Sequence, residues 1–378
     1  MATTTGEAGG QNAAPGGAQD ERIKEVSLIA RLMRRPELGA VAGVVIVAIF
    51  FLFTADSSMF TLAGVMNFMS PAAQLGILAI GAALLMIGGE FDLSIGSMVA
   101  FTGLIFAALV VPYGVPVLPA IAITLVAAAI LGAINGQIVI RTGLPSFIVT
   151  LGFLFIFRGL SLVGLKYATG GSTQLRGVRD ATEGSFVAGL FSGEAFTPLF
   201  SFLASIGLVE TFPNGVPKVT GVPVEILWFI GLAIVASLVL NRTAVGNWIF
   251  ASGGDANAAS NSGVPVRRVK TGLFMLTACC AALVAIITVL DSGSTDARRG
   301  FQKEFEAIIA AVIGGCLLTG GYGSAIGAFF GAIIFGMVLI GLSYTPIDQD
   351  WYLVFLGGML LVAVLFNNMI RKRATGER

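Results

Sequence analysis

The strongest constraint in this sequence is a series of continuous apolar segments, each about as long as the core of a bilayer is thick. A helix needs roughly 20 predominantly apolar residues to cross that core, whereas the strands of a membrane barrel alternate apolar and polar residues. The segments here do not alternate, and 56% of the chain is hydrophobic while only 11% is charged. The sequence therefore predicts an all-α integral membrane protein with spanning helices.

About ten transmembrane helices are expected, with broken or re-entrant helices where glycines cluster. Short cytoplasmic segments collect Lys and Arg, and three basic clusters fall on one side when the helices are threaded alternately. Because these clusters flank the first and last segments and separate the sixth from the seventh, both termini are predicted to be cytoplasmic. The apolar segments lie near residues 38–54, 62–87, 95–112, 117–139, 146–165, 224–240, 272–290, 305–319, 325–344 and 351–369.

Polar stretches divide the chain further. We expect residues 1–35 to be a disordered cytoplasmic tail, residues 36–370 a transmembrane domain and residues 371–378 a second cytoplasmic tail. Within the domain, residues 166–223 are predicted to lie on the outer side and residues 242–270 to form a cytoplasmic loop. The apolar part of the outer segment is too short to span comfortably, so it either lies flat at the interface or dips partway in.

Composition excludes several function classes. The chain has no histidine, which removes the commonest general base and transition-metal ligand. Its 22 Lys plus Arg nearly balance its 21 Asp plus Glu, which leaves no basic field for nucleic acid. Cys279, Cys280 and Cys316 fit no zinc spacing and are interpreted as small buried residues. We therefore expect no cofactor, no metal site, no catalytic residue and no nucleic-acid partner.

Two acids stand out within the apolar sequence, in the stretch IGGEFDLSIGSMVAF that starts at Ile87. A carboxylate inside the hydrocarbon costs roughly 2.5–3.5 kcal/mol, so Glu90 and Asp92 should face a cavity, a partner or the interface. One interpretation is a capped turn between two helices, in which Asp92 or Ser94 accepts the free N–H groups of the next helix. The other is a broken helix that lines a translocation path or gate.

A second stretch, IGGCLLTGGYGSAIGAF, starts at Ile313 and matches the first at Ile-Gly-Gly, at Gly-Ser and at the final Phe when short gaps are allowed. Transporters are often built from internal repeats, which is one explanation of the match. The other explanation is that glycine-rich membrane turns resemble one another.

Four motifs in register give the chain a family resemblance. GGEFDLSIGS, NGQIVIRTGLPSFIVTLGFLFIFRGLS, GGDANAASNSGVPVRRVK and AVIGGCLLTGGYGSAIGAFFGAIIFG occur in the order and spacing of the membrane subunit of ribose-type sugar importers of the ATP-binding-cassette class, which the chain resembles from about residue 40 to residue 370. The resemblance implies a type II-like, homodimeric permease of ten spans in the bacterial inner membrane. It also implies a cytoplasmic ATPase and a periplasmic sugar-binding protein as partners. Segment 166–223 lies outside the resemblance and is longer than is usual in the family, so we expect it to be a periplasmic insertion.

The cytoplasmic loop supports an ATPase contact. Residues Asp255 to Gly263 favour a short helix, and Gly263 and Pro265 are residues that typically end one. This pattern is expected of a small docking helix. It resembles the coupling loop of the family, although Asn257 stands where a Glu is usual, which weakens any ionic contact there. The candidate coupling residues are Gly254, Asp255, Asn257, Ala258, Ala259, Ser262 and Gly263. The chain itself has no G-x-x-x-x-G-K-[ST] loop, so ATP hydrolysis is expected on the partner.

A neutral sugar requires a path of amides, hydroxyls and aromatic rings. Asn67, Ser70 and Gln74 are spaced to share one helix face, which cannot be turned to lipid without leaving polar groups unpaired. The candidate path and gate residues are Asn67, Phe68, Ser70, Gln74, Glu90, Asp92, Ser94, Thr150 and Phe153. Arg158 also lies in an apolar segment, and either pairs with an acid or extends to the outer interface.

Two other functions remain open. A branched-chain amino-acid permease subunit would share the loop organisation, although GGEFDLSIGS resembles the sugar branch. A self-sufficient ion-coupled transporter would use Glu90 and Asp92 as its ion site. A monosaccharide or related polyol as substrate, with energy from a partner ATPase, is the preferred interpretation.

Overall fold

The protein is described by a computed structural model that places the backbone of residues 36–375 and the side chains of residues 37–365. The expected N-terminal tail, residues 1–35, and the side chains of the C-terminal tail lie outside the described residues. So do the side chains of the basic clusters at the two ends of the chain, whose placement on one side of the membrane stays a prediction.

Each of the ten apolar segments contains a helix. These helices are α2 (Pro36–Thr54), α3 (Leu62–Ile87), α4 (Ile95–Val110), α5 (Val117–Thr142), α6 (Ser146–Thr169), α10 (Val224–Arg242), α13 (Val266–Ser292), α14 (Lys303–Ile313), α15 (Ala325–Gly341) and α16 (Trp351–Thr375). In the described part of the chain, seven of the helices are long and apolar enough to cross a bilayer, which makes this a multi-pass all-α membrane protein.

Three helices fall outside that set, and two boundaries differ from expectation. Helix α4 has 16 residues and α14 only 11, and the part of α16 with described side chains, Trp351–Leu365, is also too short. Residues 314–319 were predicted to continue α14, which instead ends at Ile313 because two glycines follow it. Helix α13 begins at Val266 rather than near residue 272, since its first turns are polar and gave no apolar signal.

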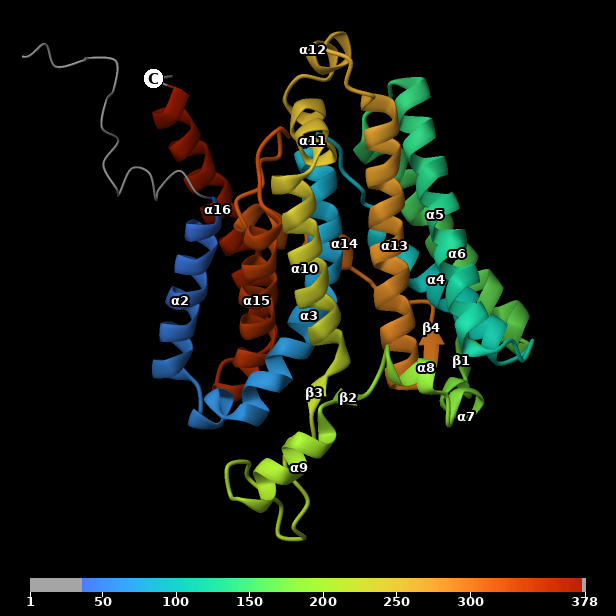
Figure 1. Cartoon of the computed structure of the whole chain (residues 1–378), viewed down its shortest axis with the longest axis vertical. Helices are drawn as coiled ribbons and strands as arrows, with labels where there is room; N and C mark the ends of the chain where they lie inside the picture. Colours follow the sequence, from blue (N-terminus) through green and yellow to red (C-terminus); the bar gives the residue numbers. More distant parts are fainter. Residues whose placement is uncertain (1–35, 376–378) are drawn as a thin grey trace, which may run out of the picture. The chain divides into compact units, whose positions relative to one another are not determined.

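The two ends of the bundle differ in structure (Figure 1). At one end lie α11 (Ala244–Gly254) and α12 (Ala256–Asn261). At the other end, residues 170–223 form the short helices α7 (Val178–Thr182), α8 (Phe186–Gly189) and α9 (Thr197–Ser205). Two antiparallel pairs fasten this segment, namely β1 (Gln174–Arg176) with β4 (Ser294–Asp296), and β2 (Glu194–Ala195) with β3 (Val222–Pro223).

The centre of the bundle is formed by α3 and α13. In the most apolar window of α3, 83% of the residues are buried, compared with 11% for α2. Small residues allow this close packing: a side chain on Gly76 would overlap the ring of Phe229, and one on Gly132 would overlap the backbone of Phe274. Helix α3 also contains Pro71 and bends in its N-terminal half (Figure 1). The turn that follows α3 is therefore attached to one of the most buried helices of the bundle.

Candidate functional site

Two glycines end α3 in a defined cap. Gly89 has φ +81°, its N–H donates to the carbonyl of Met86 at 2.9 Å, and the N–H of Glu90 donates to the carbonyl of Leu85 at 3.1 Å. This pair of bonds is a Schellman motif, which needs a residue in the left-handed region at the position of Gly89. Helix α3 can therefore end sharply after Ile87. This agrees with the prediction that helices break where glycines cluster.

Helix α14 ends in the same way. Gly315 has φ +89°, its N–H donates to Val312 at 2.9 Å, and the N–H of Cys316 donates to Ala311 at 3.0 Å. The next helices, α4 and α15, both begin directly after a serine, Ser94 or Ser324. The two similar stretches thus share one local structure, a Schellman end followed by a turn and a new helix.

A buried polar network holds the first turn. Asp92, whose side chain is 5% exposed, accepts bonds from the Ser94 N–H at 2.8 Å, the Ser94 hydroxyl at 2.6 Å and the Thr277 hydroxyl of α13 at 3.2 Å. The amide of Asn135 on α5 donates to the Ser94 oxygen at 3.0 Å. The hydroxyl of Ser94 is engaged by Asp92 and does not cap α4. Asp92 and Ser94 therefore link the start of α4 to α13 and α5.

Helix α6 supplies the acceptors for the backbone of the same turn. Ser146 Oγ accepts from the N–H of Phe91 and Thr150 Oγ1 from the N–H of Leu93, both at 3.0 Å. These bonds satisfy two N–H groups that no helix pairs. Of the predicted path and gate residues, the structure thus brings Asp92, Ser94 and Thr150 together around residues 88–94.

Glu90 is paired on the other side of the turn. Its Oε1 lies 2.6 Å from Nζ of Lys270, and the two side chains are only 13% and 14% exposed. Lys270 belongs to the first turns of α13, which directly follow the α11–α12 connection. The pair was missed by sequence reasoning because the residues are 180 positions apart and because Lys270 was grouped with the cytoplasmic basic cluster.

Arg158 does not pair with Glu90 or Asp92, and its extension to the outer interface stays a prediction. Its Nη1 donates to the carbonyls of Ala297 at 3.0 Å and Arg299 at 2.9 Å, and its guanidinium lies 5.8 Å from the ring centroid of Phe301. Backbone carbonyls of the loop between β4 and α14 therefore satisfy this cation. No sequence signal identifies such partners.

The three polar residues of α3 have separate environments. The amide of Asn67 donates to the Tyr344 hydroxyl at 3.1 Å in η2 (Leu342–Tyr344), and the Ser70 hydroxyl donates to Oε1 of Glu225 at 2.5 Å. Gln74 makes no side-chain hydrogen bond within the described residues, and its side chain is half-buried. The buried acid Glu225, in the first turn of α10, was missed, although an acid at the start of an apolar segment was a visible signal.

The two predicted aromatic residues lie apart. Phe68 is 7% exposed and packs in an apolar cluster with Phe51 and Met59, on the side of α3 that faces α2 and α15. Phe153 lies 5.3 Å from Phe157, centroid to centroid, on α6. The structure therefore does not group either ring with Asn67, Ser70 and Gln74.

The predicted docking helix is present as α12. Asp255 is its N-cap, and Oδ1 accepts from the N–H groups of Asn257 at 2.9 Å and Ala258 at 3.0 Å. At its other end Gly263 has φ +85° and the N–H of Val264 donates to Ala259 at 3.0 Å. Ala258 and Asn257 are exposed whereas Ala259 is buried. The remaining candidates, Gly254 and Ser262, are exposed and flank the helix.

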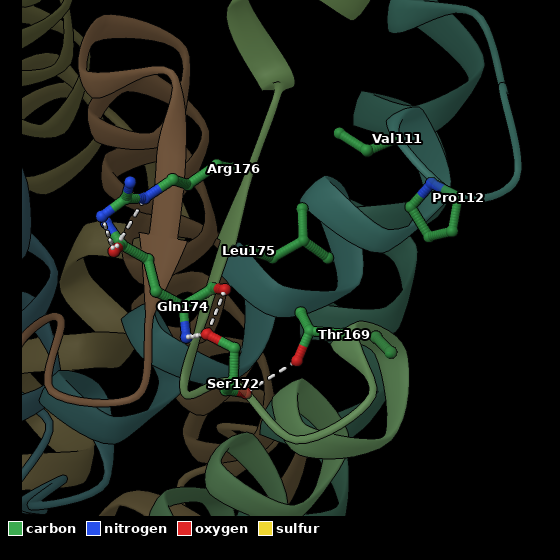
Figure 2. A pocket seen from close by; sticks show the side chains of 8 residues that line it. Val111, Pro112, Thr169, Ser172, Gln174, Leu175 and Arg176 are labelled. Carbon is green, nitrogen blue, oxygen red and sulfur yellow. Dashed lines mark hydrogen bonds between the residues drawn. The ribbon is translucent and has the colours of Figure 1, made fainter.

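One pocket of about 510 Å³ lies far from these residues, between the ends of α4 and α6 and strand β1 (Figure 2). Its polar groups bond one another: Arg176 donates to Gln174 Oε1 at 2.9 Å, Ser172 Oγ donates to the Gln174 carbonyl at 2.9 Å, and Thr169 donates to the Ser172 carbonyl at 2.8 Å. Figure 2 shows Leu175 and Pro112 beside them. None of the predicted site residues lines this pocket.

Comparisons with known proteins agree with this architecture. Residues 64–364 match the family described as branched-chain amino acid transport system / permease component. The chain is 30% identical to the xylose transport system permease protein XylH of Escherichia coli K12, over 88% of this chain and 92% of the relative. It is 32% identical to the xylose/arabinose import permease protein XylH of Sulfolobus acidocaldarius, over 90% and 86%.

A third relative, the ribose import permease protein RbsC of Escherichia coli K12, is 30% identical over 90% of this chain and 95% of the relative. No solved structure matches the chain. Because the family match covers most of the described helices, from α3 to α16, the chain belongs to the family of permease components described as branched-chain amino acid transport system / permease component.

Proposed function

We propose that the chain is the permease subunit of an ATP-binding-cassette importer that carries a monosaccharide or a related polyol across the bacterial inner membrane. The observation that carries the proposal is the similarity to three sugar permeases over 88–90% of the chain. The chain crosses the membrane ten times in alternating direction, and α14 forms only half of the eighth crossing, which ends in the turn of residues 314–324. Both termini are cytoplasmic, and residues 166–223 form a periplasmic insertion.

The chain works with partner proteins. ATP is hydrolysed on cytoplasmic ATPase chains, a periplasmic sugar-binding protein delivers the substrate, and a second copy of the permease completes a homodimer. Helix α12 docks to the ATPase, because its exposed Ala258 and Asn257 offer a small, uncharged surface at the end of the bundle opposite α9 (Figure 1).

The path follows the face of α3 that carries Asn67, Ser70 and Gln74, and residues 88–94 narrow it on the cytoplasmic side. Gln74, with no side-chain bond in the described part of the chain, is the residue of the three most available to a sugar hydroxyl. Glu90 and Asp92 already have partners that satisfy them, which supports a structural or gating role over a coupling-ion site.

A branched-chain amino-acid permease is the second candidate, and the name of the matching family favours it. The test is reconstitution of the permease in liposomes with its ATPase and binding protein, followed by uptake of labelled pentoses and leucine. ATP-dependent uptake of a pentose supports the proposal, and uptake of leucine alone supports the second candidate. Uptake by the lone chain under an ion gradient would contradict both.

A further inference from the structure

Three backbone segments meet at one junction through glycines. The C-terminal end of α11 contributes Gly253, the turn after α3 contributes Gly89, and the turn after α14 contributes Gly320. A Cβ on Gly320 would lie 2.7 Å from both the Gly253 oxygen and the Gly89 Cα, and a Cβ on Gly89 would lie 3.1 Å from the Gly253 Cα. These distances leave no room for side chains, so the three backbones touch directly.

Hydrogen bonding closes the junction. The carbonyl of Ile87, the last residue of α3, accepts from the N–H of Gly321 at 2.9 Å. A Cβ on Gly253 would overlap that same carbonyl oxygen and would lie 2.7 Å from the Gly321 nitrogen. The end of α11 is thus packed against the bond that joins the two Schellman turns.

The other end of the same connection is fastened to the same turn. Residues 244–270 carry α11 and α12 and end at Lys270, whose ammonium pairs with Glu90 at 2.6 Å. Helix α12 therefore lies between two attachments to residues 88–94, a backbone contact at Gly253 and an ion pair at Lys270. Backbone groups packed in contact transmit a displacement, whereas a flexible side chain between them would absorb part of it.

We propose that Gly253 is a positioning residue that transmits movement of α12 to both turns, residues 88–94 and 314–324. The inference rests on the proposed function, in which α12 contacts the ATPase. A movement of α12 reaches the turn after α3 and the turn after α14 together, since both touch Gly253. The two turns move as one unit.

The experiment compares Gly253→Ala with Gly272→Ala in the assembled complex. Gly272 lies on α13 with open space around its Cβ position, so the control adds the same methyl group without a clash. We expect Gly253→Ala to lower the amount of substrate transported per ATP hydrolysed about tenfold, within the usual range of coupling between sites. The complex should still assemble with the ATPase, and basal ATP hydrolysis per assembled complex should stay at the level of the control.

A second variant adds a methyl group to the same junction from the turn after α14. Gly321 has φ +73°, and a Cβ there would lie 2.8 Å from the Gly254 Cα, so Gly321→Ala should give the same loss of coupling. Thr319→Cys, at an exposed position in the turn after α14, reports the movement. The alkylation rate of this cysteine should change when ATP is added to the permease with Gly253, and should not change in Gly253→Ala.

The outcomes separate the two proposals. If the unmodified complex shows no ATP-dependent transport, the proposed function fails. If it transports and Gly253→Ala couples as well as Gly272→Ala does, only the role of Gly253 fails. Loss of assembly in both Gly253→Ala and Gly321→Ala would make the junction a folding element and would likewise overturn the inference.

A second, independent inference concerns α9, whose residues divide into three faces. Phe200, Leu203 and Ala204 face inward and pack in a cluster that includes Ala63 and Met66 at the start of α3. Ser201 and Ser205 form a polar face, and the exposed apolar face carries Leu199, Phe202 and Ile206, with Phe202 60% exposed.

The exposed apolar face of α9 carries no charge and adjoins other exposed apolar side chains. No charged residue occurs between Glu194 and Glu210. Exposed Phe60 and Leu62 lie at the start of α3, next to the residues on which α9 packs. We infer that the outer leaflet of the bilayer covers this face, so that α9 lies in the interface with its serines toward water.

The test uses a solvent-sensitive fluorophore on a single cysteine in full-length permease, with the native cysteines replaced. Labels at Phe202→Cys and at Ser201→Cys, the adjacent position on the polar face, are compared in phosphatidylethanolamine–phosphatidylglycerol vesicles. The label at 202 should be quenched by nitroxide lipids and the label at 201 by iodide. Equal quenching of both labels by iodide, or shielding of 202 only when the binding protein is added, would overturn the inference.

Discussion

The turns at residues 88–94 and 314–324 begin alike and are anchored differently. Both start with a Schellman end, but the first is held by side chains, through Asp92, Thr150 and the Glu90–Lys270 pair. The second has one such side-chain bond, from the Ser324 hydroxyl to Oε1 of Glu37 at 2.9 Å, and is held chiefly by backbone packing, since a Cβ on Gly314 or on Gly327 would overlap the backbone of the other. One local structure can thus be fixed by polar pairing or by close approach, and each choice has its own vulnerability.

The largest effect is expected for Asp92→Leu. It leaves the Ser94 N–H and the hydroxyls of Ser94 and Thr277 without their acceptor in a buried site. Each buried donor left unpaired costs about 1–3 kcal/mol, so a loss of roughly 3 kcal/mol or more is expected. Thermal unfolding in detergent measures it. Asp92→Asn, which keeps an acceptor oxygen, should lose less, and equal stability of the Leu variant and the parent would refute the role of the network.

Gly327→Ala should produce the next largest effect, at the start of α15, which packs against the start of the second turn. The added methyl group meets the backbone of Gly314, which cannot move aside, and overpacking of this kind typically costs about 1–3 kcal/mol. Gly88→Ala in the first turn meets the Leu273 side chain, which can rotate, and should cost less. Unfolding midpoints of the two variants give the comparison. If Gly88→Ala proved the more damaging, backbone packing would not distinguish the second turn.

The ion pair of the first turn should show a measurable coupling. Glu90→Lys and Lys270→Glu each leave two like charges together, whereas the double exchange restores an attractive pair. We expect the double variant to recover about 1 kcal/mol relative to the sum of the single variants, within the range found for contacting residues. Stability and ATP-driven uptake are both measured. Additive losses would show that the pair contributes nothing beyond its separate side chains.

The smallest effect is expected for Thr150→Val, which keeps the shape of the side chain and removes the acceptor for the Leu93 N–H. One unmade bond costs about 1 kcal/mol, and Thr150→Ser, which keeps the hydroxyl, serves as the control. Amide hydrogen exchange at Leu93 reports the change directly. Exchange as slow in the Val variant as in the Ser variant would mean that another group takes the place of the hydroxyl.

Helix positions were predictable because long apolar runs and their glycine ends are local signals. The ends of α3 and the cap of α12 at Asp255 illustrate this, since each depends on residues a few positions apart. The partners of Glu90 and Arg158 were not predictable, because they come from segments more than 130 positions away. Helix α11 was not predicted. Thr243 is a suitable N-cap residue for it, but the three glycines in the helix are more typical of a loop.

The shortness of α9 bears on how the chain enters the membrane during synthesis. Nine helical residues extend about 14 Å, less than half of a hydrocarbon core of roughly 30 Å. If this segment were long enough to be retained as a crossing, every later helix would be inverted and Lys270 would be delivered to the opposite compartment. The two serines in α9 and the acids that flank it, Glu194 and Glu210, limit its apolar length, so this small helix preserves the topology of the whole second half of the chain.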